Sequence, residues 1–121
     1  MAEQMATGRP IDSHCHIVPS GLVKEAKRSG RALGIQVEDS PQGAVLTFPG
    51  IPTLRPVTRG HTSLEDRIQW MDREGIGMQL LASWLDVQGY SLPAKEAATW
   101  ARALNEQLTP EASSKKDRFR A

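Results

Sequence analysis

The stretch Ile11-Asp12-Ser13-His14-Cys15-His16-Ile17-Val18-Pro19 decides how this chain is interpreted. It is typical of a short β-strand that ends at the proline, because proline has no N–H to give to a central ladder. Side chains two positions apart in a strand point to the same face. We therefore expect His14 and His16 to project together, with Cys15 on the opposite face. The same alternation predicts that Asp12 shares the histidine face.

Two imidazoles on one strand face can form half of a metal site, because histidine is the commonest metal ligand. The plainer interpretation is that both histidines are polar residues on a solvated strand face, since H-x-H is short enough to occur by chance. The strand-like start at Pro10 and Ile11 and the neighbouring carboxylate of Asp12 favour the metal site.

Three segments resemble successive parts of one protein family. The first stretch carries D-x-H-x-H followed by I-V-P; residues 64–76, LEDRIQWMDREGI, are similar to an R-x-x-x-M-D-x-x-G-I segment; residues 100–108, WARALNEQL, are similar to the helix that follows. Together they resemble the N-terminal segment of the amidohydrolase superfamily, in the amidohydrolase-related branch that includes aminocarboxymuconate-semialdehyde decarboxylase. The resemblance covers nearly the whole chain and is weakest over residues 31–59.

The resemblance implies an α/β fold, namely the N-terminal βαβα part of a metal-dependent (β/α)8 TIM barrel. Such a barrel needs about 250 residues, and this chain has 121. We therefore expect residues 1–121 to form a partial barrel domain, with Asp117-Arg-Phe-Arg120 at the approach to the third strand. The rest of the barrel would come from a further segment, a partner chain or an oligomer.

The residues themselves predict two parallel strands joined by helices, with a hairpin inserted between them. Proline, glycine and serine or threonine signals place the boundaries. The expected strands lie at 11–17 and 77–82, and the helices at 20–29, 63–74 and from 93 onward, with Pro110 able to kink the last one. The insertion spans 31–60, with hairpin strands at 35–37 and 44–48.

The loops after the strands are the expected substrate site, because barrel active sites are built from such loops. The hairpin would cover the site or be a surface decoration. By the resemblance, an arginine near Arg59 holds a substrate carboxylate, with Arg55 as a rival and two solvated arginines as the alternative. Trp84 would line a pocket for a planar substrate or anchor the core. We expect His61 to be a surface or hydrogen-bonded residue.

The resemblance implies that His14 and His16 bind one divalent metal ion, zinc being the expected one. In the family a histidine and an aspartate from later strands complete the site, and His61 matches neither of them. Asp12 matches no ligand position, so we expect it to orient an imidazole from behind. No residue is assigned as general acid or base.

Composition excludes some partners. The net charge of +1 gives no reason to expect nucleic acid, and no apolar run is long enough to predict a transmembrane helix. Residues 1–10 lack the apolar stretch of a secretory signal. The single Cys15 cannot form an internal disulfide, which indicates a reducing, cytoplasmic setting.

Two functions follow from these observations. The chain is either the N-terminal portion of a metal-dependent decarboxylase or hydrolase acting on a carboxylate-bearing, aromatic small molecule, or a catalytically incomplete chain that docks on another subunit. A small module with an accidental H-x-H is a third interpretation, and the three ordered motifs argue against it.

Overall fold

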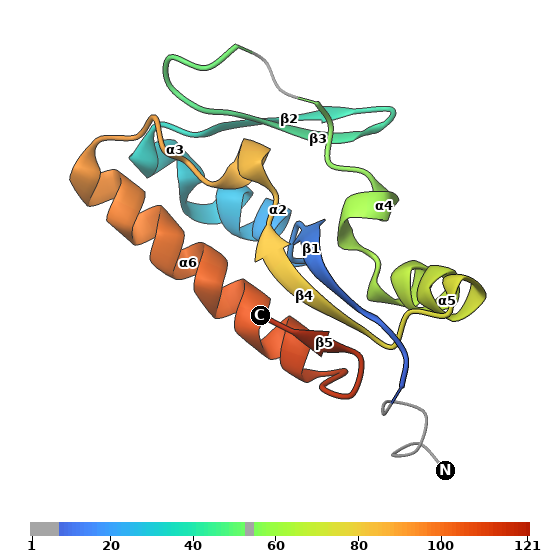
Figure 1. Cartoon of the computed structure of the whole chain (residues 1–121). Coiled ribbons are helices and arrows are strands. Elements are labelled where there is room, and N and C mark those ends of the chain that lie inside the picture. The colour runs from blue at the N-terminus through green and yellow to red at the C-terminus, as the bar shows by residue number, and fades with distance from the viewer. Residues whose placement is uncertain (1–7, 53–54) are drawn as a thin grey trace.

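The computed structural model describes residues 8–52 and 55–121 (Figure 1), so residues 1–7 and part of the 31–60 insertion lie outside the described residues. The elements in chain order are β1 (Ile11–Ile17), α2 (Leu22–Glu25), η1 (Ala26–Gly30), α3 (Arg31–Leu33), β2 (Gln36–Ser40), β3 (Gly43–Thr47), α4 (Arg59–Thr62), α5 (Leu64–Glu74), β4 (Met78–Ser83), η2 (Leu85–Val87), α6 (Ala94–Ser113) and β5 (Phe119–Arg120).

Three strands form a parallel sheet in the order β1-β4-β5. The fold is therefore α/β, and the predicted parallel pairing of the first two long strands is confirmed. The two residues of β5 pair with Gln79 and Leu80 of β4, so a third parallel strand begins where the sequence predicted its approach. A regular crossover joins parallel strands through helices, which explains why α5 and α6 alternate with β4 and β5.

Both long helices cover the same face of this sheet. Met71 of α5 and Leu108 of α6 belong to one buried cluster with Ile17 of β1, Leu81 of β4 and Phe119 of β5. The opposite face is open: Leu80 has 41% of its surface exposed. A parallel sheet usually has both faces covered, so this one is half covered within the described residues.

The hairpin packs beyond the carboxyl ends of β1 and β4 (Figure 1). A second buried cluster unites Val18 and Trp84, which follow those strands, with Leu46 and Phe48 from β3 and its end. The predicted hairpin is confirmed, with β2 and β3 antiparallel. The hairpin lies over the strand ends because its apolar side chains Leu46 and Phe48 are buried against Val18 and Trp84.

The first helical segment is longer than predicted. We expected a helix over residues 20–29, but the helical segment continues through a π turn to Leu33 and ends at Gly34, whose φ is +91°. Gly30 has helical dihedrals, and its missing side chain lets Ile35 lie against it, since an added Cβ would be 3.3 Å from Ile35 Cβ. Gly30 thus serves packing rather than termination.

The prediction for α5 is confirmed at both ends. The Ser63 hydroxyl accepts the backbone N–H of Asp66 at 3.1 Å, and Gly75 ends the helix with a φ of +72°.

Asp72 pairs with Arg118 at 2.9 Å, and Arg118 also donates to the carbonyls of Ile76 and Gly77. The M-D-x-x-G-I segment therefore joins α5 and β4 to the start of β5.

Pro110 does not interrupt α6, which runs to Ser113. Its missing N–H removes one helical hydrogen bond, while Leu108 and Ala112 on either side remain buried against the sheet. Packing therefore outweighs the lost bond.

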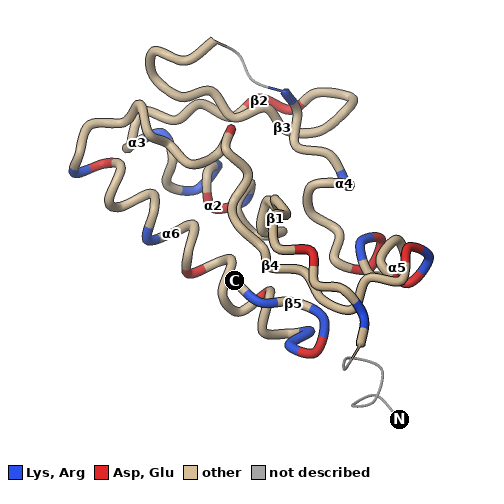
Figure 2. The backbone as a smooth tube through the Cα atoms, in the orientation of Figure 1, with Lys and Arg blue, Asp and Glu red and all other residues tan. Residues whose placement is uncertain are grey.

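Charged residues gather on α5 and on the turn before β5 (Figure 2), with both signs interspersed. No helix in residues 8–52 and 55–121 combines the length and the apolar character needed to cross a membrane.

Candidate metal centre

The two histidines of β1 lie together, as the strand alternation predicted. Their Nε2 atoms are 3.2 Å apart, and the two rings are perpendicular with centroids 4.9 Å apart. His14 is exposed and His16 is half-buried. Their shared face is the open face of the sheet, because His16 pairs with Ala82 while Leu81 and Cys15 lie on the helix side.

The ring of His16 is oriented by the neighbouring strand. Its Nδ1 lies 3.2 Å from the carbonyl oxygen of Ser83 at the end of β4. A carbonyl only accepts, so Nδ1 carries the proton and donates it, which makes Nε2 of His16 an acceptor. In the metal-free chain this acceptor faces Nε2 of His14, which donates its proton to it, and a metal ion would take the place of that proton. The Gln88 amide supports this carbonyl with a further hydrogen bond of 3.1 Å and also donates to the Ser83 hydroxyl at 3.0 Å.

This geometry fits two ligands of one zinc ion. Zinc–nitrogen bonds of about 2.0–2.1 Å at a tetrahedral angle place two ligand nitrogens about 3.3 Å apart, close to the 3.2 Å between His14 and His16. A metal-binding histidine also usually donates its other ring N–H to a carbonyl or carboxylate, as His16 does. Among the described residues no group of three histidine, cysteine, aspartate or glutamate side chains could hold a metal ion.

The predicted position of Asp12 on the histidine face is wrong, because β1 is not regular. Asp12 pairs with Gln79 and Cys15 pairs with Leu81, so β1 has one more residue than β4 between these pairs. The extra residue turns Asp12 to the helix side. Its carboxylate accepts hydrogen bonds from the Gln79 amide at 3.2 Å and from the backbone N–H of His14 at 3.4 Å. Its hydrogen bond to His14 is therefore made to the main chain.

Cys15 lies on the face opposite the histidines, as predicted. It is buried beside Met71 and Leu81, and its thiol donates to the Asp12 carbonyl at 3.4 Å. Burial, followed by the proximity of the Asp12 carboxylate, raises the pKa of this thiol to about 12. A thiol held protonated in this way is a packing residue and a poor ligand.

The two candidate substrate arginines are both paired with carboxylates. Arg59 contacts Asp66 through two hydrogen bonds of 2.6 and 3.0 Å. The hydrogen bonds and charge of this carboxylate raise the pKa of Arg59. Arg55 lies 3.3 Å from Asp86 and places its guanidinium carbon 5.1 Å from the centroid of the Trp84 ring. Arg55 is therefore the arginine that lies against Trp84.

Trp84 anchors the core at the end of β4. It is 7% exposed and belongs to the buried cluster beneath the hairpin. One of its faces stacks on His61, with ring centroids 4.1 Å apart. The His61 Nδ1 accepts the Thr58 backbone N–H at 3.0 Å. Burial, with a smaller contribution from Arg55, lowers the pKa of His61. The hydrogen-bonded interpretation of His61 is supported.

Four residues that contact the site were not predicted from the sequence: Arg67, Gln79, Ser83 and Gln88. One signal was present, because Gln79 is the polar residue within the otherwise apolar 77–82 run. Its amide turned out to bridge Arg67 and Asp12. The contact to Ser83 uses a main-chain atom, which no residue pattern can reveal.

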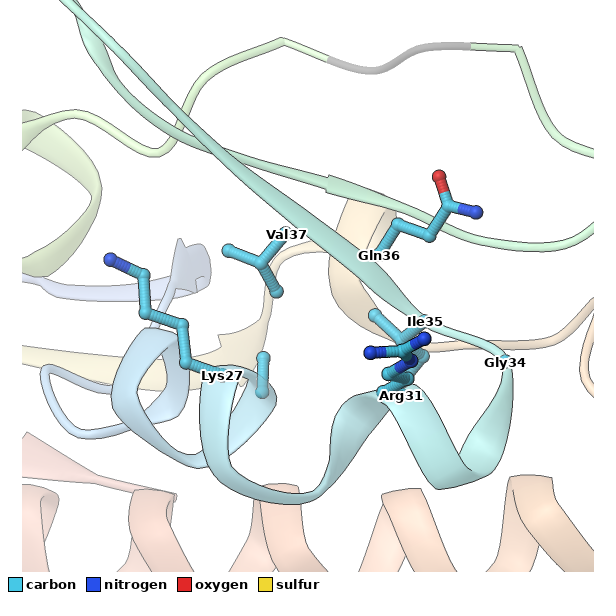
Figure 3. Close-up of a pocket in the computed structure, with 7 residues that line it drawn as sticks. Lys27, Arg31, Gly34, Ile35, Gln36 and Val37 are labelled. Carbon is cyan, nitrogen blue, oxygen red and sulfur yellow. The ribbon is translucent and has the colours of Figure 1, made fainter.

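A separate hollow lies between the first helical segment and β2 (Figure 3). Its lining includes Lys27, Arg31 and Val37. Lys27 is paired with Asp39 at 2.8 Å, which offsets the charge that would attract an anion. We assign this hollow no role in the candidate metal centre.

Comparison with known proteins adds no relative: no protein-family model and no curated protein matches this chain.

Proposed function

We propose that this chain is the N-terminal portion of a metal-dependent enzyme of the amidohydrolase-related type, and that His14 and His16 supply two ligands to a divalent ion, zinc being the expected one. The remaining ligands and the general acid or base would come from a further barrel segment or a partner chain. The reaction would be decarboxylation or hydrolysis of a carboxylate-bearing, aromatic small molecule.

One observation carries this proposal: the Nε2 atoms of His14 and His16 are 3.2 Å apart while Nδ1 of His16 faces the Ser83 carbonyl. A fixed tautomer of His16 and two Nε2 atoms turned toward one point are what a pair of metal ligands requires, whereas solvated histidines need neither. The half-covered parallel sheet supports the proposal that this chain is part of a barrel. Helices cover one face, and the open face, which carries both histidines and Leu80, would be the one turned to the barrel interior.

The chain's own residues would bind and orient the substrate. A bound divalent ion supplies Lewis-acid polarisation or activates water. Arg59, the arginine nearest the family position, would have to release Asp66 before it could hold a carboxylate. Arg55 has a longer contact with Asp86, 3.3 Å, and lies on Trp84. We therefore propose Arg55 ahead of Arg59 as the carboxylate-binding residue, with Trp84 as the wall behind it.

A second function is that the chain docks on another subunit without catalysing a reaction. The observation in its favour is the open face of the sheet and its edges, which are unpaired among residues 8–52 and 55–121; Ile11 and Leu80 are 59% and 41% exposed there. Unpaired strand edges favour pairing with another chain. For either function we propose a cytoplasmic location, since a reduced Cys15 suits that compartment.

Zinc titration of the chain tests the proposal. We expect weak, saturable binding of one ion, because two imidazoles fill half of a tetrahedral site. The double variant His14→Ala/His16→Ala should lose this binding. His61→Ala serves as the matched control and should retain it. Zinc binding by the double variant at the wild-type affinity would contradict the site.

The arginine assignment has its own test. With benzoate as the probe, Arg55→Ala should weaken binding about tenfold or more, since a charge-assisted contact is lost. Arg59→Ala should have a smaller effect. The reverse order would return the assignment to Arg59.

A further inference from the structure

A chain of partly buried polar groups, with Gln79 fully buried at its centre, lies behind the two histidines on the helix side of the sheet. Arg67 of α5 donates Nη2 to the His16 carbonyl at 2.9 Å and Nη1 to the Gln79 side-chain oxygen at 3.4 Å. Gln79 donates to Asp12 at 3.2 Å, and Asp12 accepts the His14 backbone N–H at 3.4 Å. The chain thus begins on a helix and ends on the main chain of both histidines.

Such a network is costly in a core, which indicates that it serves something other than stability. Gln79 is 3% exposed, at a position where a covered parallel strand ordinarily carries an aliphatic residue. Arg67 Nε is buried without a hydrogen-bond partner among the described residues. Burial of polar groups is unfavourable unless they are paired. An aliphatic residue at position 79 would avoid much of this cost.

The network spans the irregular part of β1. Asp12 lies before the extra residue, His14 lies within the irregular stretch, and His16 lies after it. A β-bulge redirects side chains and is often found beside functional sites. The Arg67 and Asp12 contacts hold the two ends of this irregularity at fixed positions relative to α5 and β4.

We propose that Arg67 and Gln79 are positioning residues that fix the extra residue of β1 and thereby hold the His14 and His16 Nε2 atoms at the separation one metal ion requires. This inference rests on the proposed metal site. Arginine suits the role because its planar fork reaches two acceptors at once, whereas a lysine ammonium is a single point charge.

Zinc affinity of the full chain is the first measurement. Arg67→Met and Gln79→Leu should each weaken zinc binding about tenfold to a hundredfold, the usual effect of removing an outer contact of a metal ligand. Arg73→Met, at an exposed position of the same helix, should leave the affinity unchanged. Arg67→Lys should restore part of the loss, because it keeps one donor for the His16 carbonyl.

The imidazole nitrogen–proton correlations of the metal-free protein give a second measurement that does not depend on zinc. Arg67→Met should shift the signals of His14 and His16 and leave those of His61 in place. Circular dichroism would show whether each variant folds, and Gln79→Leu carries the test if Arg67→Met does not. Unchanged ring signals and unchanged zinc affinity in a folded variant would overturn the inference.

The two proposals can fail separately. If the wild-type chain binds no zinc, or if the double histidine variant binds it normally, the metal site is wrong, and the ring signals still decide whether Arg67 positions the imidazoles. If the metal site holds but Arg67→Met and Gln79→Leu behave like Arg73→Met, the positioning inference alone is wrong.

Discussion

At the scale of single residues, the surroundings of His61 favour one protonation state of its imidazole. Its Nδ1 accepts the Thr58 N–H at 3.0 Å, and its ring stacks on Trp84. An accepting nitrogen must be unprotonated, and burial lowers the pKa of His61 from its ordinary 6.5. Arg55 opposes protonation and Asp86 favours it, the contribution of Arg55 being the larger. The folded chain therefore favours the neutral imidazole.

The lowered pKa of His61 predicts that the folded chain loses stability as the pH falls. Below pH 6.5 the unfolded chain takes up a proton at His61 that the folded chain resists. Stability is thus full above that pH and falls as the pH drops toward the lowered folded value. Each pKa unit of difference is worth about 1.4 kcal/mol. Urea unfolding at pH 7.5, 6.5 and 5.5 should show a steeper decline for the wild type than for His61→Gln. An equal decline in the free energy of unfolding for both proteins would contradict the prediction.

The residues of the candidate site were partly predictable. Strand alternation predicted that His14 and His16 lie on the same face. The hydrogen bond between their Nε2 atoms confirms this. Asp12 was misplaced because alternation assumes a regular strand, whereas β1 has an extra residue. The contact between Arg67 and the His16 carbonyl joins residues 51 positions apart. No spacing rule covers such a distance.

At the scale of elements, replacing two glycines by alanine distinguishes the cost of backbone strain from the cost of a steric collision. Gly75 at the end of α5 has a φ of +72° and nothing within 4 Å of an added Cβ. Gly43 at the start of β3 has a φ of +134°, and an added Cβ would collide with the Val57 carbonyl. Gly75→Ala should cost about 1 kcal/mol from strain alone.

Gly43→Ala should cost more than Gly75→Ala, since the Val57 backbone must also move. Gly60→Ala is the matched control, because Gly60 has no positive φ and its added Cβ makes only an ordinary contact at 3.6 Å. It should change the free energy of unfolding by less than about 0.5 kcal/mol. Denaturant unfolding of the three variants measures the order, and a neutral Gly43→Ala would show that the hairpin does not need the close approach.

Sequence patterns found the elements better than their ends. Ser63 and Gly75 marked α5 correctly, because capping and left-handed glycine are local effects. The predicted end of the first helix at residue 29 was wrong, since the next residue, Gly30, continues the helix and leaves room for Ile35. Pro110 is able to interrupt or kink a helix, but α6 continues past it to Ser113, with Leu108 and Ala112 buried on either side. In both cases tertiary packing decided against a local rule.

At the scale of the whole molecule, the sheet has one covered and one open face. Leu80 lies on the open face with 41% of its surface exposed, in the central strand of the sheet. Among the described residues the sheet has unpaired edges, and Leu80 is an exposed apolar side chain on its open face; both favour association. We expect the isolated chain to associate with itself, to be partly molten or to depend on a partner.

Leu80→Lys should reduce this association without unfolding the chain, since position 80 faces away from α5 and α6. Leu85→Lys, at a leucine that is 63% exposed outside the sheet, is the matched control and should leave association unchanged. Sedimentation velocity over a range of concentrations measures both. A monodisperse wild-type monomer that unfolds cooperatively would contradict the expectation.

The order of strands and helices was predictable at this scale, since apolar runs and caps carry it. A closed barrel was inferred from the resemblance alone, and it stays a prediction. The described residues show a three-stranded sheet, and neither composition nor periodicity in this chain encodes what would cover its open face.

The carbonyl of Ser83 that orients His16 has a consequence for how the chain can evolve. A main-chain oxygen is present whatever amino acid the codon specifies, so drift at position 83 leaves the acceptor for Nδ1 in place. Arg67 and Gln79 offer no such tolerance, because their side chains make the contacts. The orientation of the His16 ring therefore tolerates substitution of Ser83, whereas the main chain of both histidines depends on the side chains of Arg67 and Gln79. We therefore expect lineages that lose the metal to lose Arg67 or Gln79 early.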